Sequence, residues 1–184
     1  MKQKVVLLGA STGGPSQIKE ILKEIENLSS IIIVVQHMKE EVLPFFIKDI
    51  NNNCSFNVQR TPLIFPINKP SIIICTHSSI IEKKENFFTI KTDIANQHYT
   101  PDINQLFHSF AQYAEQFDTD VIIMTGIGSD GVDGASALKK SGAKVYAQDE
   151  ESSPVYGMPK AAYERGIVNE VKSLSEIKAY FRSL

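Results

Sequence analysis

Short apolar runs alternate with helical patterns along most of this sequence, and that alternation restricts the chain to a small set of folds. The clearest run is Ile31–Val35, five β-branched residues in a row, which predicts a strand buried on both faces. Val5–Leu8 is a similar run. Between these two runs, apolar residues recur at helical spacing from Ile18 to Leu28, as in an amphipathic helix. A strand, a helix and a second strand in such a short span predict a βαβ unit.

The same alternation continues toward the C-terminus. Apolar spacing predicts a long helix over residues 103–117, and Asp120–Met124 predicts another buried strand. Predicted helices near residues 132–138 and 159–165 are each followed by a further predicted strand, at 143–147 and 167–171. Ser173-x-x-Glu176 is a capping box that begins a last helix.

Residues 54–92 have a different pattern. Three short β-rich runs, at 56–60, 71–75 and 87–91, are separated by prolines and by a charged turn, which predicts an antiparallel insert or sheet extension. The fold class predicted from the whole sequence is α/β. We expect a doubly wound, mostly parallel sheet with helices on both faces and a small antiparallel β extension.

Length and composition favour one globular domain over residues 1–184, since 42% of the residues are hydrophobic and 22% are charged. The net charge of −2 does not favour a nucleic acid partner. Cys54 and Cys75 predict free thiols in a reducing compartment. After Met-Lys-Gln-Lys, a run of only four apolar residues precedes Gly9, too few for a signal peptide or a membrane span, so we expect a cytoplasmic protein without membrane insertion.

The turn Gly9-Ala-Ser-Thr-Gly-Gly-Pro15 joins the first predicted strand to the first helix and fits three interpretations. Pro15 suits the first position of a helix, so Ser11 would lie beside a helix N-terminus, where backbone N–H groups favour an oxyanion. Gly9-x-Ser11-x-Gly13 matches the nucleophile elbow of hydrolases. Gly9 and Gly14 also have the spacing of a phosphate-binding loop, but Pro15-Ser16 replaces its Lys-Ser/Thr pair. A glycine-rich turn with an unreactive serine is the third interpretation.

Ser11, His37 and Asp130 each lie just past the C-terminal end of a predicted buried strand. Taken singly, His37 is compatible with a histidine that caps a backbone group, and Asp130 with an ordinary Asp-Gly turn. In open α/β sheets, however, these strand ends meet at one edge, where sites form. A nucleophile, a base and an orienting acid at one edge are the components of a Ser-His-Asp triad. The order Ser, His, Asp differs from that of α/β-hydrolases, so that family is not expected.

A second glycine-rich turn leaves a nucleotide site open as an alternative. Gly126-x-Gly128-x-x-Gly131 follows a predicted strand and matches a dinucleotide fingerprint, with Asp149 about twenty residues further on. Asp130 inside this turn would place a carboxylate beside the pyrophosphate, which disfavours that interpretation. A metal site is not expected either, because His77, His98 and His108 lack ligand spacing.

Four segments together resemble the catalytic domain of CheB, the chemotaxis protein-glutamate methylesterase. They are Gly9–Pro15, Val34–Met38, Thr125–Gly131 and Gln148–Pro159, which occur in the family's order and span most of the chain. The resemblance implies a triad of Ser11, His37 and Asp130, without a cofactor. It also implies that backbone N–H groups of Thr12 and Ile127 form the oxyanion hole.

The resemblance further implies an activity and a partner. The expected reaction is hydrolysis of glutamyl methyl esters on the cytoplasmic helices of methyl-accepting chemoreceptors, giving glutamate and methanol, and many members also deamidate receptor glutamines. A nucleotide-binding protein and a catalytically inactive receptor-binding module remain as alternatives.

The sequence departs from the family pattern in three places. The block from His98 to Phe107 lacks the family's arginine, and Cys75-Thr-His77 replaces its Ala-Pro-Gly segment. Family members usually carry an N-terminal receiver domain, whereas this sequence starts at the first catalytic strand. We therefore expect a chain without a receiver domain that is constitutively active and does not respond to a phosphodonor.

Overall fold

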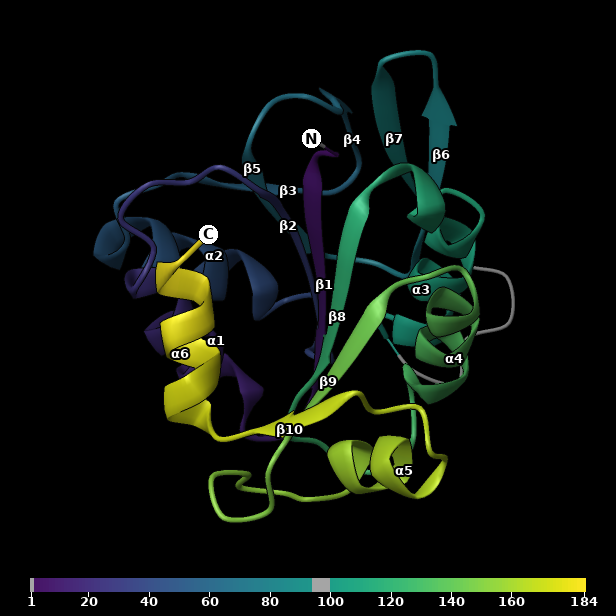
Figure 1. Ribbon diagram of the computed structural model, residues 1–184. Coiled ribbons are helices and arrows are strands. Elements are labelled where there is room, and N and C mark those ends of the chain that lie inside the picture. The colour runs from purple at the N-terminus through teal and green to yellow at the C-terminus, as the bar shows by residue number, and fades with distance from the viewer. Residues whose placement is uncertain (1, 94–99) are drawn as a thin grey trace.

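The computed structural model describes residues 2–93 and 100–184 (Figure 1). Its centre is a seven-stranded sheet in the order β10-β9-β8-β1-β2-β5-β3, and all neighbouring strands pair in parallel. The strands are β1 (Lys4–Ala10), β2 (Ile31–Gln36), β3 (Val58–Arg60), β5 (Ser71–Cys75), β8 (Asp118–Ile123), β9 (Lys144–Gln148) and β10 (Glu170–Lys172).

Helices cover both faces of this sheet (Figure 1). One face carries α1 (Gly14–Lys23), α2 (Leu43–Asn53) and α6 (Leu174–Arg182). The other carries α3 (Ile103–Ala111), the 3₁₀ helix η1 (Ala114–Gln116), α4 (Val132–Lys140) and α5 (Met158–Glu164). A three-stranded antiparallel sheet, β4 (Leu63–Pro66), β7 (Phe87–Thr92) and β6 (Ser79–Lys84), packs on this second side against α3. The predicted fold class is confirmed.

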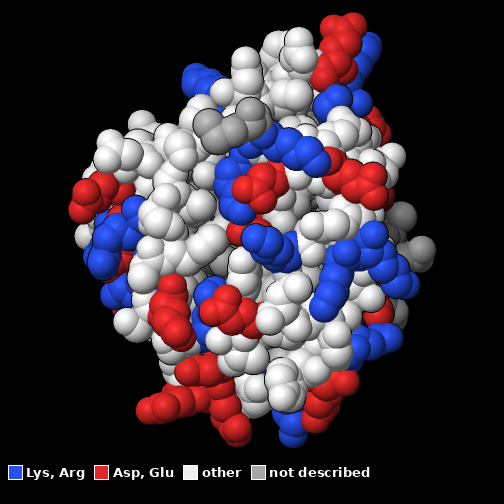
Figure 2. Space-filling model, in the orientation of Figure 1, with Lys and Arg blue, Asp and Glu red and all other residues white. Residues whose placement is uncertain are grey.

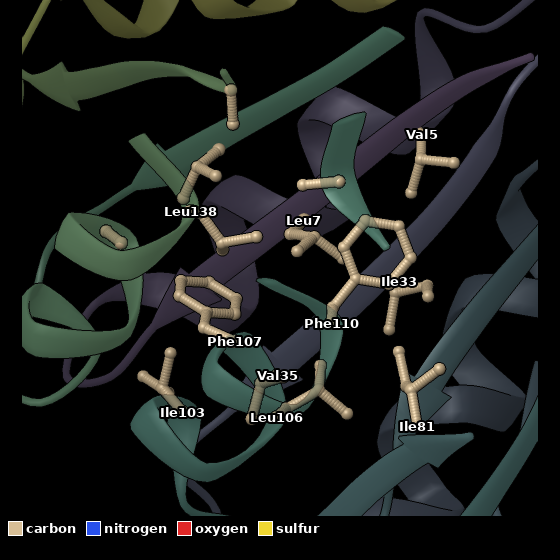
Figure 3. Close-up of a cluster of buried hydrophobic side chains, with 14 of the residues drawn as sticks. Val5, Leu7, Ile33, Val35, Ile81, Ile103, Leu106, Phe107, Phe110 and Leu138 are labelled. Atoms are coloured by element: carbon tan, nitrogen blue, oxygen red, sulfur yellow. The ribbon is translucent and has the colours of Figure 1, made fainter. Parts of the chain in front are cut away.

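The side chains of β1 explain why the central strands read as continuous apolar runs. Successive side chains point to opposite faces of a strand. Val5 and Leu7 belong to the core beneath α3 and α4, whereas Val6 and Leu8 belong to the core beneath α1, α2 and α6. Figure 3 shows the first of these cores, where Phe107 and Phe110 of α3 lie against side chains of the sheet. Both layers need apolar residues, so no polar face alternates along the strand.

The prediction for residues 54–92 is partly wrong. The runs at 71–75 and 56–60 are β5 and β3, which extend the parallel sheet beyond β2 instead of forming an antiparallel insert. The physical reason is that all five residues of β5 are buried, because β5 lies between β2 and β3 with both faces covered. Only the run at 87–91 lies in the antiparallel sheet, as β7.

Helix ends also differ from the predicted patterns. α1 ends at Lys23, so Leu28 packs against the core from the loop that follows, and the predicted long helix divides into α3 and η1. The predicted capping box of α6 is confirmed, since Ser173 and Glu176 bond each other's backbone N–H. Among the helices in the described part of the chain, none is long and apolar enough to span a membrane.

Candidate active site

Strand register brings Ser11 and His37 together at the carboxyl edge of the sheet. Ala10 of β1 pairs with Gln36 of β2, and the next residues are Ser11 and His37. The backbone N–H of His37 donates to the carbonyl oxygen of Ala10 at 2.9 Å, so the pairing continues to the point where both chains leave the sheet. Neighbouring strands lie about 4.8 Å apart, so the two residues are adjacent.

The strand order also explains why a site forms at this edge. From β1 the chain moves outward to β2 and then to the edge strand β3, and β5 comes back to lie between these two. The chain later crosses to the opposite side of β1 to form β8, β9 and β10. The loops after β1 and β8 therefore diverge to opposite faces and leave a crevice at this switch point. Ser11 follows β1, and Asp130 lies in the loop between β8 and α4.

Asp130 connects that loop to His37 and to the N-terminus of α3. Its Oδ2 atom lies 2.6 Å from Nε2 of His37 and accepts the backbone N–H of Ile103 at 2.9 Å. Its Oδ1 atom accepts the backbone N–H groups of Asn104 at 3.0 Å and Gly131 at 2.8 Å. The side chain is only 1% exposed. All four contacts come from N–H groups, the donors that a carboxylate anion requires when it is buried.

Two opposing effects set the protonation state of Asp130. Burial alone raises the pKa of its carboxyl, but the hydrogen bonds from His37 and from the α3 backbone outweigh burial and hold that pKa below its usual value. Asp130 is therefore ionised at neutral pH. Because an ionised carboxylate accepts a hydrogen, Nε2 of His37 carries the ring hydrogen and Nδ1 carries the lone pair.

Ser11 lies on a tight turn between β1 and α1. Its backbone N–H donates to the carbonyl oxygen of Thr125 at 2.9 Å, which joins the turn after β1 to the turn after β8. Its own carbonyl oxygen accepts the backbone N–H of Gly14 and the side chain of Gln36, each at 2.9 Å. The residue is 9% exposed, so the turn holds a serine that is nearly buried at the end of a helix.

Thr12 lies in the turn after β1, and Ile127 lies in the turn after β8. The Thr125 hydroxyl donates to the carbonyl oxygen of Thr12 at 2.8 Å, and Ile127 is 64% exposed at the rim of the site. Within residues 2–93 and 100–184, no hydrogen bond engages the backbone N–H of either Thr12 or Ile127. The described part of the fold therefore uses neither of these two N–H groups.

The glycines of the second turn serve the packing of this site. A Cβ atom on Gly126 would lie 2.6 Å from Cβ of Ser11 and 2.4 Å from the sulfur of Met158, so only glycine allows this close approach. Asp130 occupies the N-terminus of α3 with its carboxylate, and Asp149 accepts hydrogen bonds from Ser152 within its own turn. The spacing that resembled a dinucleotide fingerprint thus has an explanation inside the protein.

A pocket of about 630 Å³ lies at the residues that follow β5 and β3, and Ser11, His37 and Asp130 are not among its lining residues. Its lining includes Thr76 and His77, which follow β5, together with Arg60 and Glu40. Nε2 of His77 lies 2.8 Å from Oε1 of Glu40. The segment Cys75–His77, which departs from the family pattern, therefore shapes the surface next to His37 and not the triad itself.

No cluster of three or more potential metal ligands exists among the described residues. His98, which the sequence analysis considered for a metal site and for the block that ends at Phe107, lies outside the described residues.

Comparison with known proteins agrees with this geometry. The family model described as CheB methylesterase matches residues 6–181, nearly the whole chain. The chain belongs to the CheB methylesterase family. The crystal structure of the Thermotoga maritima CheB methylesterase catalytic domain is 25% identical, with a TM-score of 0.87, and the match covers 100% of this chain and 99% of that one. The resemblance drawn from the four sequence segments is confirmed.

Relatives of the CheB methylesterase family are similar over this same region. The chain is 33% identical to protein-glutamate methylesterase/protein-glutamine glutaminase 2 of Rhizobium johnstonii, over 95% of this chain and 49% of that protein. It is 34% identical to a probable protein-glutamate methylesterase of Borreliella burgdorferi, over 100% of this chain and 50% of that protein. The chain thus spans about half the length of these relatives.

Several residues of this CheB-type site were missed by the sequence analysis. The Gln36 side chain donates a hydrogen bond to the carbonyl oxygen of Ser11, and the Thr125 hydroxyl donates one to that of Thr12. The N-terminus of α3 supplies two of the four N–H donors to Asp130. Gln36 carried a signal, since it is a glutamine at the end of an apolar strand directly before His37. The α3 contacts carried none, because they are made by backbone atoms far from Asp130 in the sequence.

Proposed function

We propose that this chain is a serine esterase that hydrolyses glutamyl methyl esters to glutamate and methanol. The observation that carries the proposal is the buried His37–Asp130 pair, 2.6 Å apart, directly beside Ser11 at the switch point of a CheB-type sheet. In this proposal Ser11 is the nucleophile, His37 the general base and then acid, and Asp130 the group that orients the imidazole. Residues 1–184 act as one catalytic domain.

The first half-reaction forms an acyl-enzyme. Nδ1 of His37 accepts the hydroxyl proton of Ser11 while Oγ bonds to the ester carbonyl carbon, giving a tetrahedral oxyanion. The proton on Nδ1 then passes to the methoxide oxygen as the carbon–oxygen bond breaks, and methanol leaves. Asp130 stays ionised and stabilises the imidazolium that forms between the two proton transfers.

The second half-reaction repeats these steps with water. His37 accepts a proton from water, the hydroxide attacks the acyl carbon, and the Ser11 oxygen leaves with the proton that His37 returns. Glutamate is released and Ser11 is restored. A glutamine side chain would react by the same route with ammonia as the leaving group.

The oxyanion is stabilised by the backbone N–H groups of Thr12 and Ile127. These groups come from the turns after β1 and β8, which the bond from Ser11 N–H to Thr125 holds together. Loss of one such donor typically lowers kcat by about 10²–10³-fold, so this pair makes a large share of the expected rate enhancement.

The substrate in this proposal is the cytoplasmic helical region of methyl-accepting chemoreceptors, and the protein works in the cytoplasm. Support comes from the names of the relatives, which include both methylesterase and glutaminase activities. Acidic and basic side chains are interspersed over the face in Figure 2, which is compatible with a protein partner rather than nucleic acid.

Methanol release from methylated receptor membranes tests the proposal. Ser11→Ala should keep the fold and lower turnover by about three orders of magnitude or more, because triad members act as a unit. The matched control is Ser16→Ala, a change at an exposed serine in the first turn of α1, and it should retain full activity. Near-full turnover by Ser11→Ala would contradict the assignment, and a wild-type chain that only binds receptor would support the inactive module instead.

A further inference from the structure

Gln36 is a buried polar side chain that contacts the turns of both Ser11 and His37. It is the last residue of β2, and it is 1% exposed. Its Nε2 atom donates to the carbonyl oxygen of Ser11 at 2.9 Å and to that of His37 at 2.8 Å. The reaction steps proposed above give this side chain no role.

The orientation of the Gln36 amide follows from its neighbours. Both contacts are carbonyl oxygens, which can only accept, so the NH₂ group and not the oxygen must face them. Oε1 then points at Gly14, where a Cβ atom would lie 2.1 Å from it, and within the described residues Oε1 has no hydrogen-bond partner. Gly14 therefore leaves the space that allows this amide to stay in place.

The contact with Ser11 also determines where the backbone N–H of Thr12 points. The carbonyl of Ser11 and the N–H of Thr12 belong to one planar trans peptide, so they point in opposite directions. That carbonyl is held by Gln36 on one side and by the N–H of Gly14 on the other. With the oxygen fixed in this way, the peptide cannot rotate, and the Thr12 N–H remains directed away from Gln36.

We propose that Gln36 is a positioning residue that holds the Ser11–Thr12 peptide so that its N–H is ready to bind the oxyanion, and that ties this peptide to His37. The inference rests on the proposed esterase function. It assigns Gln36 no contact with substrate. Its effect is on the transition state, because the ester carbonyl needs the Thr12 donor most when negative charge develops on its oxygen.

Gln36→Met tests the proposal with a side chain of similar length that cannot donate. The N–H of Gly14 still holds the Ser11 carbonyl in this variant, so we expect a smaller loss than removal of a donor would give, about 10- to 100-fold in kcat with KM within about twofold. A boronic acid, which forms a tetrahedral anionic adduct with Ser11, should bind weaker by a similar factor. The acid limb of the pH–rate profile should stay at the same pH, because Asp130 still orients His37.

Gln17→Met is the matched control. Gln17 is also a buried glutamine, 6% exposed, and it donates to a single carbonyl, that of Ser152 at 2.8 Å. We expect this variant to lose thermal stability much as Gln36→Met does, while kcat and boronate affinity stay within about twofold of the wild type.

Gly14→Ala perturbs the same contact without a change at Gln36, and it keeps the test decisive if Gln36→Met does not fold. The added methyl would lie 2.1 Å from Oε1 of Gln36 and 2.9 Å from Cβ of Ala10. The contact with Oε1 is much the closer, so the amide must turn away and kcat should again fall with KM preserved. Wild-type kcat in either folded variant, or an unchanged boronate affinity beside a reduced kcat, would overturn the inference while the esterase assignment stands. A wild-type chain that hydrolyses no ester would overturn both.

Discussion

Asp130→Asn is the substitution whose effect the structure defines most closely. The variant keeps one oxygen, which can still accept the N–H groups of Asn104 and Gly131. In place of the other oxygen it presents an NH₂ group to the N–H of Ile103 and to Nε2 of His37. If the introduced side-chain amide were rotated by 180°, its oxygen would accept from Ile103 and His37, and its NH₂ group would face the N–H groups of Asn104 and Gly131 instead. At least one buried N–H is therefore left unpaired in either orientation.

The expected loss of stability follows from these contacts. An unpaired buried N–H costs about 1–3 kcal/mol. Loss of the anion at the N-terminus of α3 costs about 0.3–1 kcal/mol more. We therefore expect a decrease of about 1–4 kcal/mol in the free energy of unfolding, which for a chain of this size lowers Tm by about 3–16 °C.

The expected loss of activity is larger and has a separate cause. The favoured amide orientation leaves one backbone N–H unpaired, that of Ile103, instead of the two of Asn104 and Gly131. In that orientation the NH₂ group donates to Nε2 of His37, which moves the ring hydrogen to Nδ1 and removes the lone pair that accepts the Ser11 proton in the proposed mechanism. Substitutions that favour the wrong tautomer in this way lower kcat by about 10⁴-fold, and binding of the substrate should change little.

Methanol release and thermal unfolding, measured on the same preparations, check both numbers. Asp133→Asn is the control, because Asp133 lies three residues away, is 61% exposed and pairs with Arg165 on the surface. This control should change Tm by no more than about 2–4 °C, which corresponds to the loss of about 1 kcal/mol or less. An Asp130→Asn variant with more than a tenth of wild-type kcat would refute the tautomer argument, and an unchanged Tm would refute the hydrogen-bond argument.

Three further outcomes can be measured directly. The pKa of Asp130 lies lower in the folded protein than in the unfolded chain, where it is about 3.9, so the ionised carboxylate stabilises the fold above that pH. This contribution to the free energy of unfolding should disappear as the pH falls below about 4. Circular dichroism at low pH checks this, and parallel acid-unfolding curves for the wild type and an Asp130→Asn variant would contradict it. The value of kcat/KM should decrease on the acid side because His37 must be neutral to accept a proton, and a flat profile from pH 5 to 9 with folded enzyme would argue against a histidine base. Burial raises the pKa of the Cys75 thiol to about 12, so in a titration with an aromatic disulfide the partly exposed Cys54 should react first and Cys75 only on unfolding; equal rates in the native protein would contradict this burial.

The sequence by itself determined the fold class and the family. β-branched runs such as Ile31–Val35 can be recognised because a strand covered on both faces must be apolar at every position. The turn from Gly9 to Pro15 can be recognised for the same kind of reason, since a tight strand-to-helix connection needs particular residues at fixed offsets. Ser11, His37 and Asp130 could be selected as site residues because each follows a strand whose end the local pattern marks.

Tertiary structure decided everything that depends on which strands are neighbours. The run 71–75 gave no sign that β5 lies between β2 and β3, because parallel pairing is set by crossover connections and not by the residues of one strand. The same reason applies within the site. The ring nitrogen of His37 that meets Asp130, the α3 N-terminus that holds this carboxylate, and the Gln36 amide between two turns are contacts between distant segments. Their geometry exists only after the sheet has brought those segments to one edge.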